Sequence, residues 1–332
     1  MDQGIRPELD QGIRPEVEEI SADVAATAAA EAGTGAPGDF EVALESLNQW
    51  QLAWRRFKRH RLALIGASYL IFIIAVAILG PLLWPYDATN IPNAKHSGGD
   101  PPTLNPLSNL FGTDDGGRSV LQFVIVGSRI SVAVGLFTMV ISTFLGVLVG
   151  AVAGFFGGKI DGILMRFVDL MLAIPFLFVV LVAARFFGGG DPVVVIVIFG
   201  LLFWPGLARL VRALFLSLRE AEFVQAARAV GVSDVRITFR HILPNALGPI
   251  VVSATLIMAG AIVTEAFVSF LNFGIRATDI SWGNALSHAQ GALALGNWWW
   301  AFFPGMALAL TVIAVNFIGD GLRDALDPRS KE

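Results

Sequence analysis

Long apolar runs dominate the chain after residue 61. Segments free of Asp, Glu, Lys and Arg cover residues 62–84, 130–156, 193–208, 246–264 and 298–319, and a sixth, 167–184, carries only Asp169. A helix needs about 20 predominantly apolar residues to cross the hydrocarbon core of a bilayer. The pattern therefore predicts an all-α integral membrane protein with six transmembrane helices, the fourth of which extends past Arg209 toward Leu218.

The remaining segments complete the predicted organisation. Residues 41–61 place apolar side chains on one side of a helix that ends in a basic cluster, which indicates an amphipathic helix at the membrane surface. Its apolar side contains Leu44, Leu47, Trp50, Trp54 and Phe57. The predicted divisions are a tail at 1–40, this helix, a first transmembrane helix at 62–84, a loop at 85–129, a five-helix core at 130–320 and a C-terminus at 321–332.

A polar segment at residues 219–244 interrupts the predicted core. Its first part has the apolar spacing of one helix face, formed by Phe223, Ala226, Ala227 and Val230. Gly231 follows, and a residue without Cβ tolerates the left-handed turn after a helix C-terminus. The segment therefore begins with a short amphipathic helix that ends at this glycine.

A second short helix follows the glycine. Ser233 is placed to cap its N-terminus, and its apolar side contains Val235, Phe239 and Ile242. Pro244 marks the start of the next element. The two helices carry Arg219, Arg228, Arg236 and Arg240, so the segment is either a rigid docking element or a basic loop that lies on lipid headgroups.

Basic residues are distributed unevenly among the predicted loops. If the N-terminus is cytoplasmic, the inner segments contain the cluster 55–61, Lys159, Arg166, the six arginines between 209 and 240, Arg323, Arg329 and Lys331. The outer segments contain only Lys95, Arg118, Arg129, Arg185 and Arg276. Because cytoplasmic loops are enriched in Lys and Arg, both termini and the 219–244 segment are expected in the cytoplasm.

The formal charge of −4 conceals an acidic N-terminal tail. Residues 1–48 contain eleven acidic and two basic side chains, which gives this segment a net charge of −9 and the rest of the chain +5. The tail starts with the repeat DQGIRPE at 2–8 and again at 10–16. Its high charge and scarcity of large apolar residues predict disorder. The repeat is either a regulatory element or an unselected duplication.

Composition excludes several classes of chemistry. A hydrophobic content of 55% and a mean hydropathy of +0.67 exclude a soluble domain. The chain has no cysteine, so disulfides, thiolate metal sites and cysteine nucleophiles are excluded. It has no GxxxxGK[ST] phosphate loop and no HExxH or GxSxG motif. We therefore expect a protein without catalytic residues, a directly bound cofactor or a metal site.

Small residues and prolines occur within the predicted spans. Gly146, Gly150 and Gly154 form a stripe along the second span that allows another helix to approach closely. We interpret this stripe as packing within one helix bundle. Pro175 and Pro205 lie inside the third and fourth spans, where the missing backbone donors favour kinks.

Glu265 is the one acidic residue that apolar sequence flanks on both sides. A carboxylate at membrane depth is costly and faces a cavity or a polar partner. Glu265 either lines a transport pathway together with Ser269 or makes a structural bond to a backbone group or to the hydroxyl of Ser269. If the fifth helix ends near Ile262, Glu265 instead lies at the membrane interface.

The spacing within the polar segment resembles the EAA loop of ATP-binding-cassette importers, the loop that fits a cleft in the ATPase subunit. The matching residues are Ala226, Ala227, Gly231, Leu243 and Pro244. This chain has Gln225 where the loop usually has Glu, and His241 where it usually has Ile. The first departure removes a charge from the loop.

Further blocks extend the resemblance over residues 50–329. They are FGTDDGGRSVLQFVIVGSRIS (111–131), GGKIDGILMRFVDLMLAIP (157–175), EAFVSFLNFG (265–274), SWGNAL (281–286) and FFPGMALALTVIAVNFIGDGLRDALDPR (302–329). These blocks are similar to the C-type subunit of the permease family for dipeptides, oligopeptides and nickel. The chain departs from that family at Asn272, where Gly is usual, and at 276–278, where prolines are common.

The resemblance implies a type I importer permease fold and a set of partners. The partners are a homologous B-type permease, one or two ATPase subunits that use ATP and Mg, and an extracytoplasmic substrate-binding protein, in a bacterial plasma membrane. The chain itself would catalyse no covalent step. The implied ATPase-coupling residues are Glu222, Gln225, Ala226, Ala227, Gly231, His241, Leu243 and Pro244.

The cargo and the rival classes stay open at this point. Dipeptides, oligopeptides, glutathione and nickel chelates all fit the resemblance, because the binding protein selects the cargo. A self-contained secondary transporter usually needs several buried ionisable groups, and only Glu265 qualifies here. A non-transporting membrane scaffold is a further alternative.

We predict that deletion of residues 2–38 leaves complex assembly and uptake unchanged, because the tail lacks the apolar content to pack against other elements. Uptake by the truncated and full-length proteins at equal expression is the measurement. A several-fold loss of uptake after truncation would show that the tail has a function.

Overall fold

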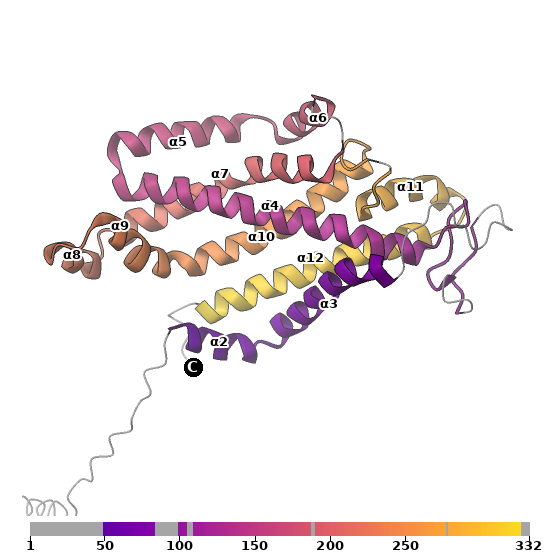
Figure 1. Ribbon diagram of the computed structural model, residues 1–332, viewed down its shortest axis with the longest axis horizontal. Helices are drawn as coiled ribbons and strands as arrows, with labels where there is room; N and C mark the ends of the chain where they lie inside the picture. Colours follow the sequence, from indigo (N-terminus) through magenta and orange to yellow (C-terminus); the bar gives the residue numbers. More distant parts are fainter. Residues whose placement is uncertain (1–48, 84–98, 105–108, 187–189, 277, 327–332) are drawn as a thin grey trace, which may run out of the picture. The chain divides into compact units, whose positions relative to one another are not determined.

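The computed structural model describes residues 49–83, 99–104, 109–186, 190–276 and 278–326. Figure 1 shows α2 (Gln49–Arg59), α3 (Arg61–Leu83), α4 (Val120–Phe156), α5 (Gly158–Ala173), α6 (Phe176–Phe186), α7 (Pro192–Leu218), α8 (Glu222–Ala229), α9 (Asp234–Ile237), the π-helical turn η2 (Thr238–Ile242), α10 (Leu243–Phe270), α11 (Trp282–Ala294) and α12 (Trp299–Leu326). The predicted tail at 1–40, the amphipathic segment at 41–48, residues 84–98 of the first loop and residues 327–332 lie outside the described residues.

Within the described residues, five helical segments are long and apolar enough to cross a membrane. They are Arg61–Leu83, Val120–Phe156, Pro192–Leu218, Asp234–Phe270 and Trp299–Leu326. A bent pair, α5 with α6, passes the same test when the two are taken together. The predicted all-α membrane fold is confirmed.

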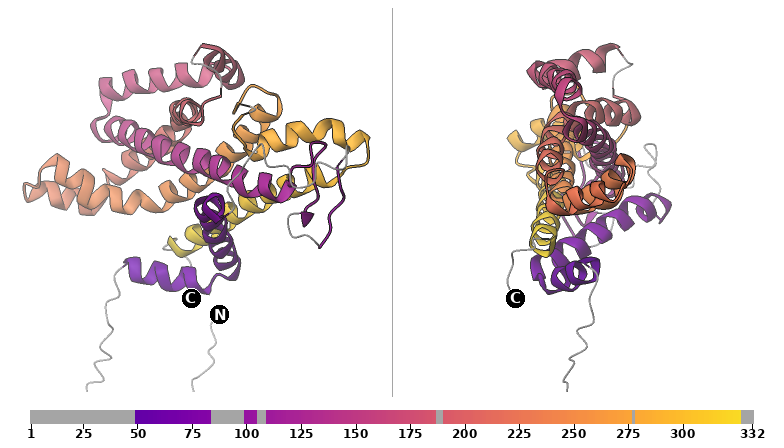
Figure 2. Two further views of the ribbon diagram at one scale, coloured as in Figure 1. Left: turned by 45° about the vertical axis from the view of Figure 1, so that its right-hand side comes forward. Right: turned by 90° about the vertical axis from the view of Figure 1, so that its left-hand side faces the viewer.

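Helices α3 and α10 run in one direction through the bundle, and α4, α7 and α12 run in the opposite direction (Figures 1 and 2). One end of the bundle contains α2, α8 and the last turn of α12, and we call it the α8 end. The opposite end contains α11, and we call it the α11 end. Helix α4 finishes at the α8 end and α7 starts toward the α11 end. Helices α5 and α6 together therefore return the chain to the α11 end and form the third of six crossings in chain order.

The third crossing departs most from the predicted spans. The sequence predicts one span over 167–184 with a kink at Pro175, whereas α5 begins at Gly158 and a bend of 77° separates it from α6. Ile174 has an extended ψ of 128°. A proline ring disfavours the helical conformation of the residue before it, so Pro175 breaks this crossing instead of kinking it.

Helix α4 is longer than the apolar run that predicts it. It begins at Val120, so residues 120–129 belong to a helix and not to the loop predicted at 85–129. Its 37 residues correspond to about 55 Å, more than the thickness of a hydrocarbon core of about 30 Å. The exposed Arg129 ends the charge-free run without ending the helix. Helix α12 similarly continues to Leu326, into the segment predicted as a C-terminus.

The glycine stripe of α4 lies against α7. A Cβ atom placed on Gly150 would lie 2.5 Å from the carbonyl oxygen of Ala208 and 2.7 Å from the Cβ of Val211. Comparable positions on Gly146 and Gly154 would meet the Cβ atoms of Leu207 at 2.9 Å and Phe215 at 2.6 Å. The interpretation of the stripe as packing within one bundle is confirmed.

We predict that Gly150→Ala destabilises the protein by about 1–3 kcal/mol, the usual cost of overpacking, because its methyl group meets the α7 backbone. Gly162→Ala is the matched control, since a Cβ at Gly162 of α5 has no neighbour within 4 Å. Thermal unfolding of the two purified variants in detergent is the measurement. Equal melting temperatures would contradict the proposed close contact.

Candidate functional site

The turn after α8 adopts the conformation that the sequence predicts. Gly231 has φ +79°, and its N–H donates to the carbonyl of Arg228 at 2.9 Å. The N–H of Val232 donates to the carbonyl of Ala227 at 3.1 Å. A Cβ at Gly231 would have no neighbour within 4 Å, so this position requires glycine for its backbone angle and not for space.

The buried side of α8 differs from the predicted one. Val224 and Ala227 are buried in a cluster with Phe215, Ile237 and Ile242. Of the face that the sequence predicts, Ala227 is buried, whereas Phe223, Ala226 and Val230 are exposed. Local periodicity does not specify which side a neighbouring helix covers, and here α7 and η2 cover the side with Val224.

An apolar surface therefore remains exposed at the α8 end. It consists of Phe223, Val230, Val235 and Phe239, and we call it the α8–η2 apolar surface. Val230, Val235 and Phe239 are 80%, 69% and 65% exposed. Val235 and Phe239 also line an apolar groove with Phe144, Phe155 and Phe156 of α4, and contiguous exposed apolar side chains of this kind mark interaction sites.

Helix α9 continues directly into the membrane-spanning helix. Pro244 lies in the first turn of α10, at the start of an element as the sequence predicts. Helix α10 nevertheless follows α9 and η2 without a break, so that Asp234–Phe270 form one run of 37 residues. The π-helical turn lies just before this proline, and the N–H of Leu243 donates to the carbonyl of Thr238. Proline removes one backbone donor, and a π-turn changes the hydrogen-bond spacing next to it. Ser233 precedes α9 but makes no side-chain capping bond, contrary to the prediction.

The other residues implied in ATPase coupling lie around this surface. Glu222, Gln225 and Ala226 are exposed, as is Pro244, and His241 and Leu243 are half-buried. The amide of Gln225 donates to the carbonyl of Glu220 at 3.0 Å. The amide of Asn245 donates to the carbonyl of His241 at 2.6 Å. These two bonds hold the polar side chains against the backbone of the segment.

Two ion pairs join α5 to α7 near the α8 end. The guanidinium of Arg212 binds both carboxylate oxygens of Asp161, and Arg209 binds Asp169 at 2.5 Å. In the sequence, Arg209 and Arg212 served only as basic residues that indicate membrane orientation, and Asp169 only as the one charge within an apolar run. Their opposite signs on two adjacent predicted helices were the available clue to the pairing.

At the α11 end, Glu265 is buried and bonded to hydroxyl groups. The residue is 1% exposed. Its carboxylate accepts hydrogen bonds from Ser131 at 2.9 Å and Ser269 at 2.8 Å. The predicted bond between Glu265 and the hydroxyl of Ser269 is present, whereas the role of Glu265 in a transport pathway stays a prediction. Helix α10 continues to Phe270, so Glu265 does not lie beyond its end.

The same serines hold the segment that leads to α11. The hydroxyl of Ser131 accepts the N–H of Trp282, and that of Ser269 accepts the N–H of Ile275, both at 3.1 Å. The amide of Asn284 lies 2.8–3.1 Å from the carbonyls of Ile275, Arg276 and Asp279. The network therefore connects α4, α10 and the N-terminus of α11. In the sequence, Ser131, Trp282 and Asn284 lie only within blocks that resemble the permease family and had no role assigned to them, since their partners lie outside their own helices.

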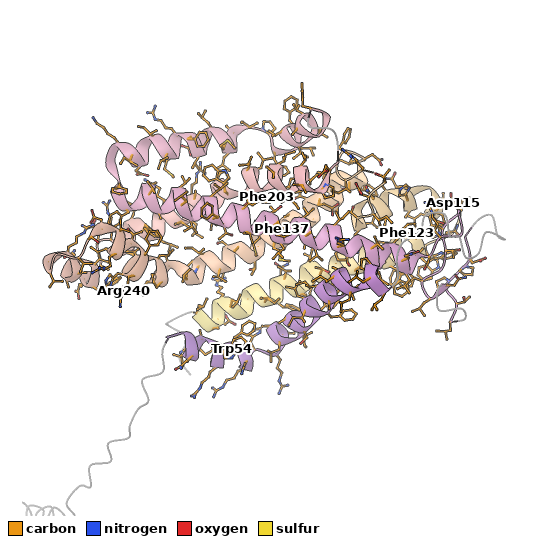
Figure 3. All side chains as sticks on the ribbon, in the orientation of Figure 1. Trp54, Asp115, Phe123, Phe137, Phe203 and Arg240 are labelled. Carbon is orange, nitrogen blue, oxygen red and sulfur yellow. The ribbon has the colours of Figure 1, made fainter. Side chains whose placement is uncertain are left out.

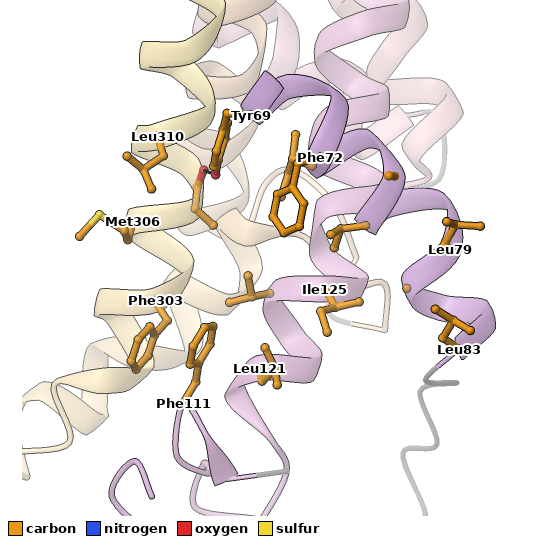
Figure 4. A pocket seen from close by; sticks show the side chains of 16 residues that line it. Tyr69, Phe72, Leu79, Leu83, Phe111, Leu121, Ile125, Phe303, Met306 and Leu310 are labelled. Atoms are coloured by element: carbon orange, nitrogen blue, oxygen red, sulfur yellow. Dashed lines mark hydrogen bonds between the residues drawn. The ribbon is translucent and has the colours of Figure 1, made fainter. Parts of the chain in front are cut away.

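A large groove between α3, α4 and α12 is unsuited to polar ligands (Figure 4). It has a volume of about 540 Å³, and its walls include Phe72, Leu121, Ile125, Phe303 and Leu310. The hydroxyl of Tyr69 donates to the carbonyl of Ala307 at 3.4 Å. The groove therefore suits apolar chains and not a charged solute.

Comparison with known families places the chain in a transport system. Residues 146–332 match the model described as "Binding-protein-dependent transport system inner membrane component". Residues 48–102 match the model described as "N-terminal TM domain of oligopeptide transport permease C". Together the two matches cover the region from α2 to the end of the chain, apart from residues 103–145.

Individual relatives match most of the chain. The dipeptide transport system permease protein DppC of Bacillus subtilis is 38% identical over 284 residues, 86% of this chain and 87% of the relative. The oligopeptide transport system permease protein OppC of Haemophilus influenzae is 39% identical over 291 residues, 88% of this chain and 92% of the relative. A putative peptide permease protein of Brucella suis is 41% identical over 285 residues, 83% and 90% of the two chains. The chain therefore belongs to the family of binding-protein-dependent transport system inner membrane components.

Proposed function

We propose that this chain is a permease subunit of an ATP-driven importer for dipeptides or oligopeptides. The observation that carries the proposal is the continuous helix from Asp234 to Phe270, which joins the α8–η2 apolar surface to the membrane-spanning bundle. A displacement of that surface moves the spanning helix with it. Relatives named as dipeptide and oligopeptide permeases support peptides as the cargo.

The distribution of charge supports an orientation with the α8 end in the cytoplasm. The basic cluster of α2 and the exposed Lys159, Arg236 and Arg240 all belong to that end. Cytoplasmic segments carry an excess of such residues. Both chain termini then lie in the cytoplasm, and the membrane is the plasma membrane of a bacterium.

Partner subunits complete the proposed transporter. One or two ATPase subunits dock on the α8–η2 apolar surface, a homologous B-type permease lies beside this chain in the membrane, and a substrate-binding protein docks at the α11 end. ATP and Mg are used by the ATPase subunits. This chain catalyses no covalent step. Its helices change position when the ATPase subunits move.

The packing suggests how motion passes through the chain. Helix α8 contacts Phe215 of α7 and Ile242 beside α10 in one buried cluster, so a shift of α8 acts on both helices. The distal part of α10 carries Glu265, which binds Ser131 of α4 and lies next to the start of α11. Movement at the α8 end therefore reaches the α11 end through packed elements, as alternating access requires.

A transport assay tests the proposal directly. The full complex, reconstituted in proteoliposomes with binding protein outside and ATP inside, is expected to accumulate a labelled peptide. Accumulation should stop without ATP and continue after collapse of the proton gradient. Uptake that needs a proton gradient and no ATP would favour a secondary transporter, and uptake of nickel chelates or glutathione but not peptides would replace the proposed cargo.

We predict that Gly231→Val lowers peptide-stimulated ATP hydrolysis at least about tenfold, since a β-branched residue at φ +79° costs free energy of the order of 1–2 kcal/mol or more. Gly231→Asn is the matched control, because Asn tolerates this conformation. ATPase activity of the two purified complexes, with and without cargo-loaded binding protein, is the measurement. Normal coupling in an assembled Gly231→Val complex would refute the role of this turn.

We also predict that Glu265 acts through position and not through proton transfer. Glu265→Gln keeps a carbonyl acceptor and the side-chain shape, so ATP-driven uptake should persist. Glu265→Ala leaves the hydroxyls of Ser131 and Ser269 without this partner, and the protein should lose about 1–3 kcal/mol of stability for each orphaned buried group. Uptake and thermal unfolding of both variants are measured together, and loss of uptake in a stable Glu265→Gln complex would contradict the prediction.

A further inference from the structure

Helix α2 lies next to the start of a membrane-spanning helix. It ends at Arg59, and α3 begins at Arg61 and continues as an apolar span to Leu83. Only His60 separates the two helices. The last turn of α2 therefore lies at the level where the hydrocarbon core gives way to lipid headgroups.

One side of α2 is fixed to the end of α12. Ala53 and Phe57 are buried in a cluster with Ala63 and Ala325. The absence of a side chain at Gly321 allows the start of α3 to approach α12, since a Cβ there would lie 2.2 Å from the Cβ of Ala63. Nε2 of His60 lies 3.5 Å from the carboxylate of Asp324. These contacts give α2 a defined orientation relative to α12.

The exposed part of α2 combines an aromatic residue, Trp54, whose ring stacks on that of Phe57 with 5.9 Å between the ring centres, with several cations. Trp54 is 57% exposed, and Figure 3 shows it on this helix. Arg55, Lys58 and Arg59 are also exposed, and the amine of Lys58 lies 5.1 Å from the centre of the Trp54 ring. We call Trp54, Arg55, Lys58 and Arg59 the α2 basic face.

Helices α2 and α3 carry no acidic side chain, and the carboxylate near their junction is that of Asp324 on α12, which lies beside His60. Residues 49–83 contain no Asp or Glu, so the α2 basic face has no neutralising carboxylate within its own helix or the next. The exposed Leu62 and Ile65 follow at the start of α3. The α2 basic face therefore borders exposed apolar side chains at the start of the membrane span. A basic surface that contacts only water would not adjoin such side chains.

We propose that the α2 basic face binds the headgroups of anionic phospholipids. Trp side chains favour the boundary between headgroups and acyl chains, and clustered Lys and Arg next to a membrane span attract anionic lipids. The aromatic ring lies at the edge of the acyl region while the three cations contact phosphodiester groups. Because α2 is packed on α12, bound anionic lipid stabilises the position of the α12 end.

The absence of cysteine makes a site-specific test straightforward. Gln51 precedes Trp54 and Arg55 by three and four residues, so Gln51→Cys places a single fluorescent label on the same helix side. The full-length labelled chain is placed in nanodiscs that contain equal fractions of brominated phosphatidylglycerol or brominated phosphatidylcholine. Quenching by the bromine atoms reports which lipid lies beside the label.

We expect clearly stronger quenching by the anionic lipid than by phosphatidylcholine. Each cation near the surface raises the local concentration of anionic headgroups by roughly fivefold, so Arg55→Gln, Lys58→Gln and Arg59→Gln together should abolish the preference. The matched control removes three exposed cations elsewhere at the α8 end through Lys159→Gln, Arg236→Gln and Arg240→Gln. This control variant should retain the preference for the anionic lipid. Salt at about 1 M, where the Debye length falls to about 3 Å, should weaken the preference of the unaltered chain for the anionic lipid.

Other occupants give different results. Equal quenching by both lipids in the unaltered chain, or a preference that survives the triple α2 substitution, would overturn the proposal. Inorganic phosphate added to phosphatidylcholine nanodiscs should leave the label unchanged, and a response equal to that of the anionic lipid would indicate a site for free anions. A photo-crosslinker attached to the thiol of the Gln51→Cys variant should react with lipid in native membranes, and a discrete protein adduct would instead identify a protein interface.

Discussion

The close approach of α4 and α7 is the contact on which the remaining packing depends. Gly150 allows the backbone of α7 to approach so closely that a single added methyl group would lie 2.5 Å from the carbonyl of Ala208. In a membrane the hydrophobic effect does not drive helices together, so small residues that permit close van der Waals contact take that role. Helix α5 then attaches to this pair through the ions of Asp161 and Arg212.

The continuous helix from Asp234 to Phe270 gives the two ends of the bundle a common element. At the α8 end it begins beside an exposed apolar surface, and toward the α11 end it carries a buried carboxylate. The π-helical turn before Pro244 keeps the helix unbroken where proline removes a donor. Two loosely joined helices would absorb a displacement, whereas a continuous helix transmits it.

The buried carboxylate of Glu265 connects three elements without solvent contact. A charged or polar group at membrane depth is stable only when its hydrogen-bonding capacity is met. Ser131 and Ser269 meet that need and at the same time hold the backbone at Trp282 and Ile275. The same bonds that accommodate the carboxylate therefore order the chain at the α11 end.

The membrane class, the all-α architecture and the left-handed turn at Gly231 follow from the amino-acid sequence alone, because hydrocarbon thickness and backbone sterics act on local sequence. The sequence also located the glycine stripe and the segment implied in coupling. The packing of the helices was needed to show which side of α8 is buried, that the third crossing breaks at Pro175, and that Glu265 binds Ser131. The last two residues are 134 positions apart. Contacts of this kind depend on how separate helices pack, and neither periodicity nor composition encodes the choice of partner.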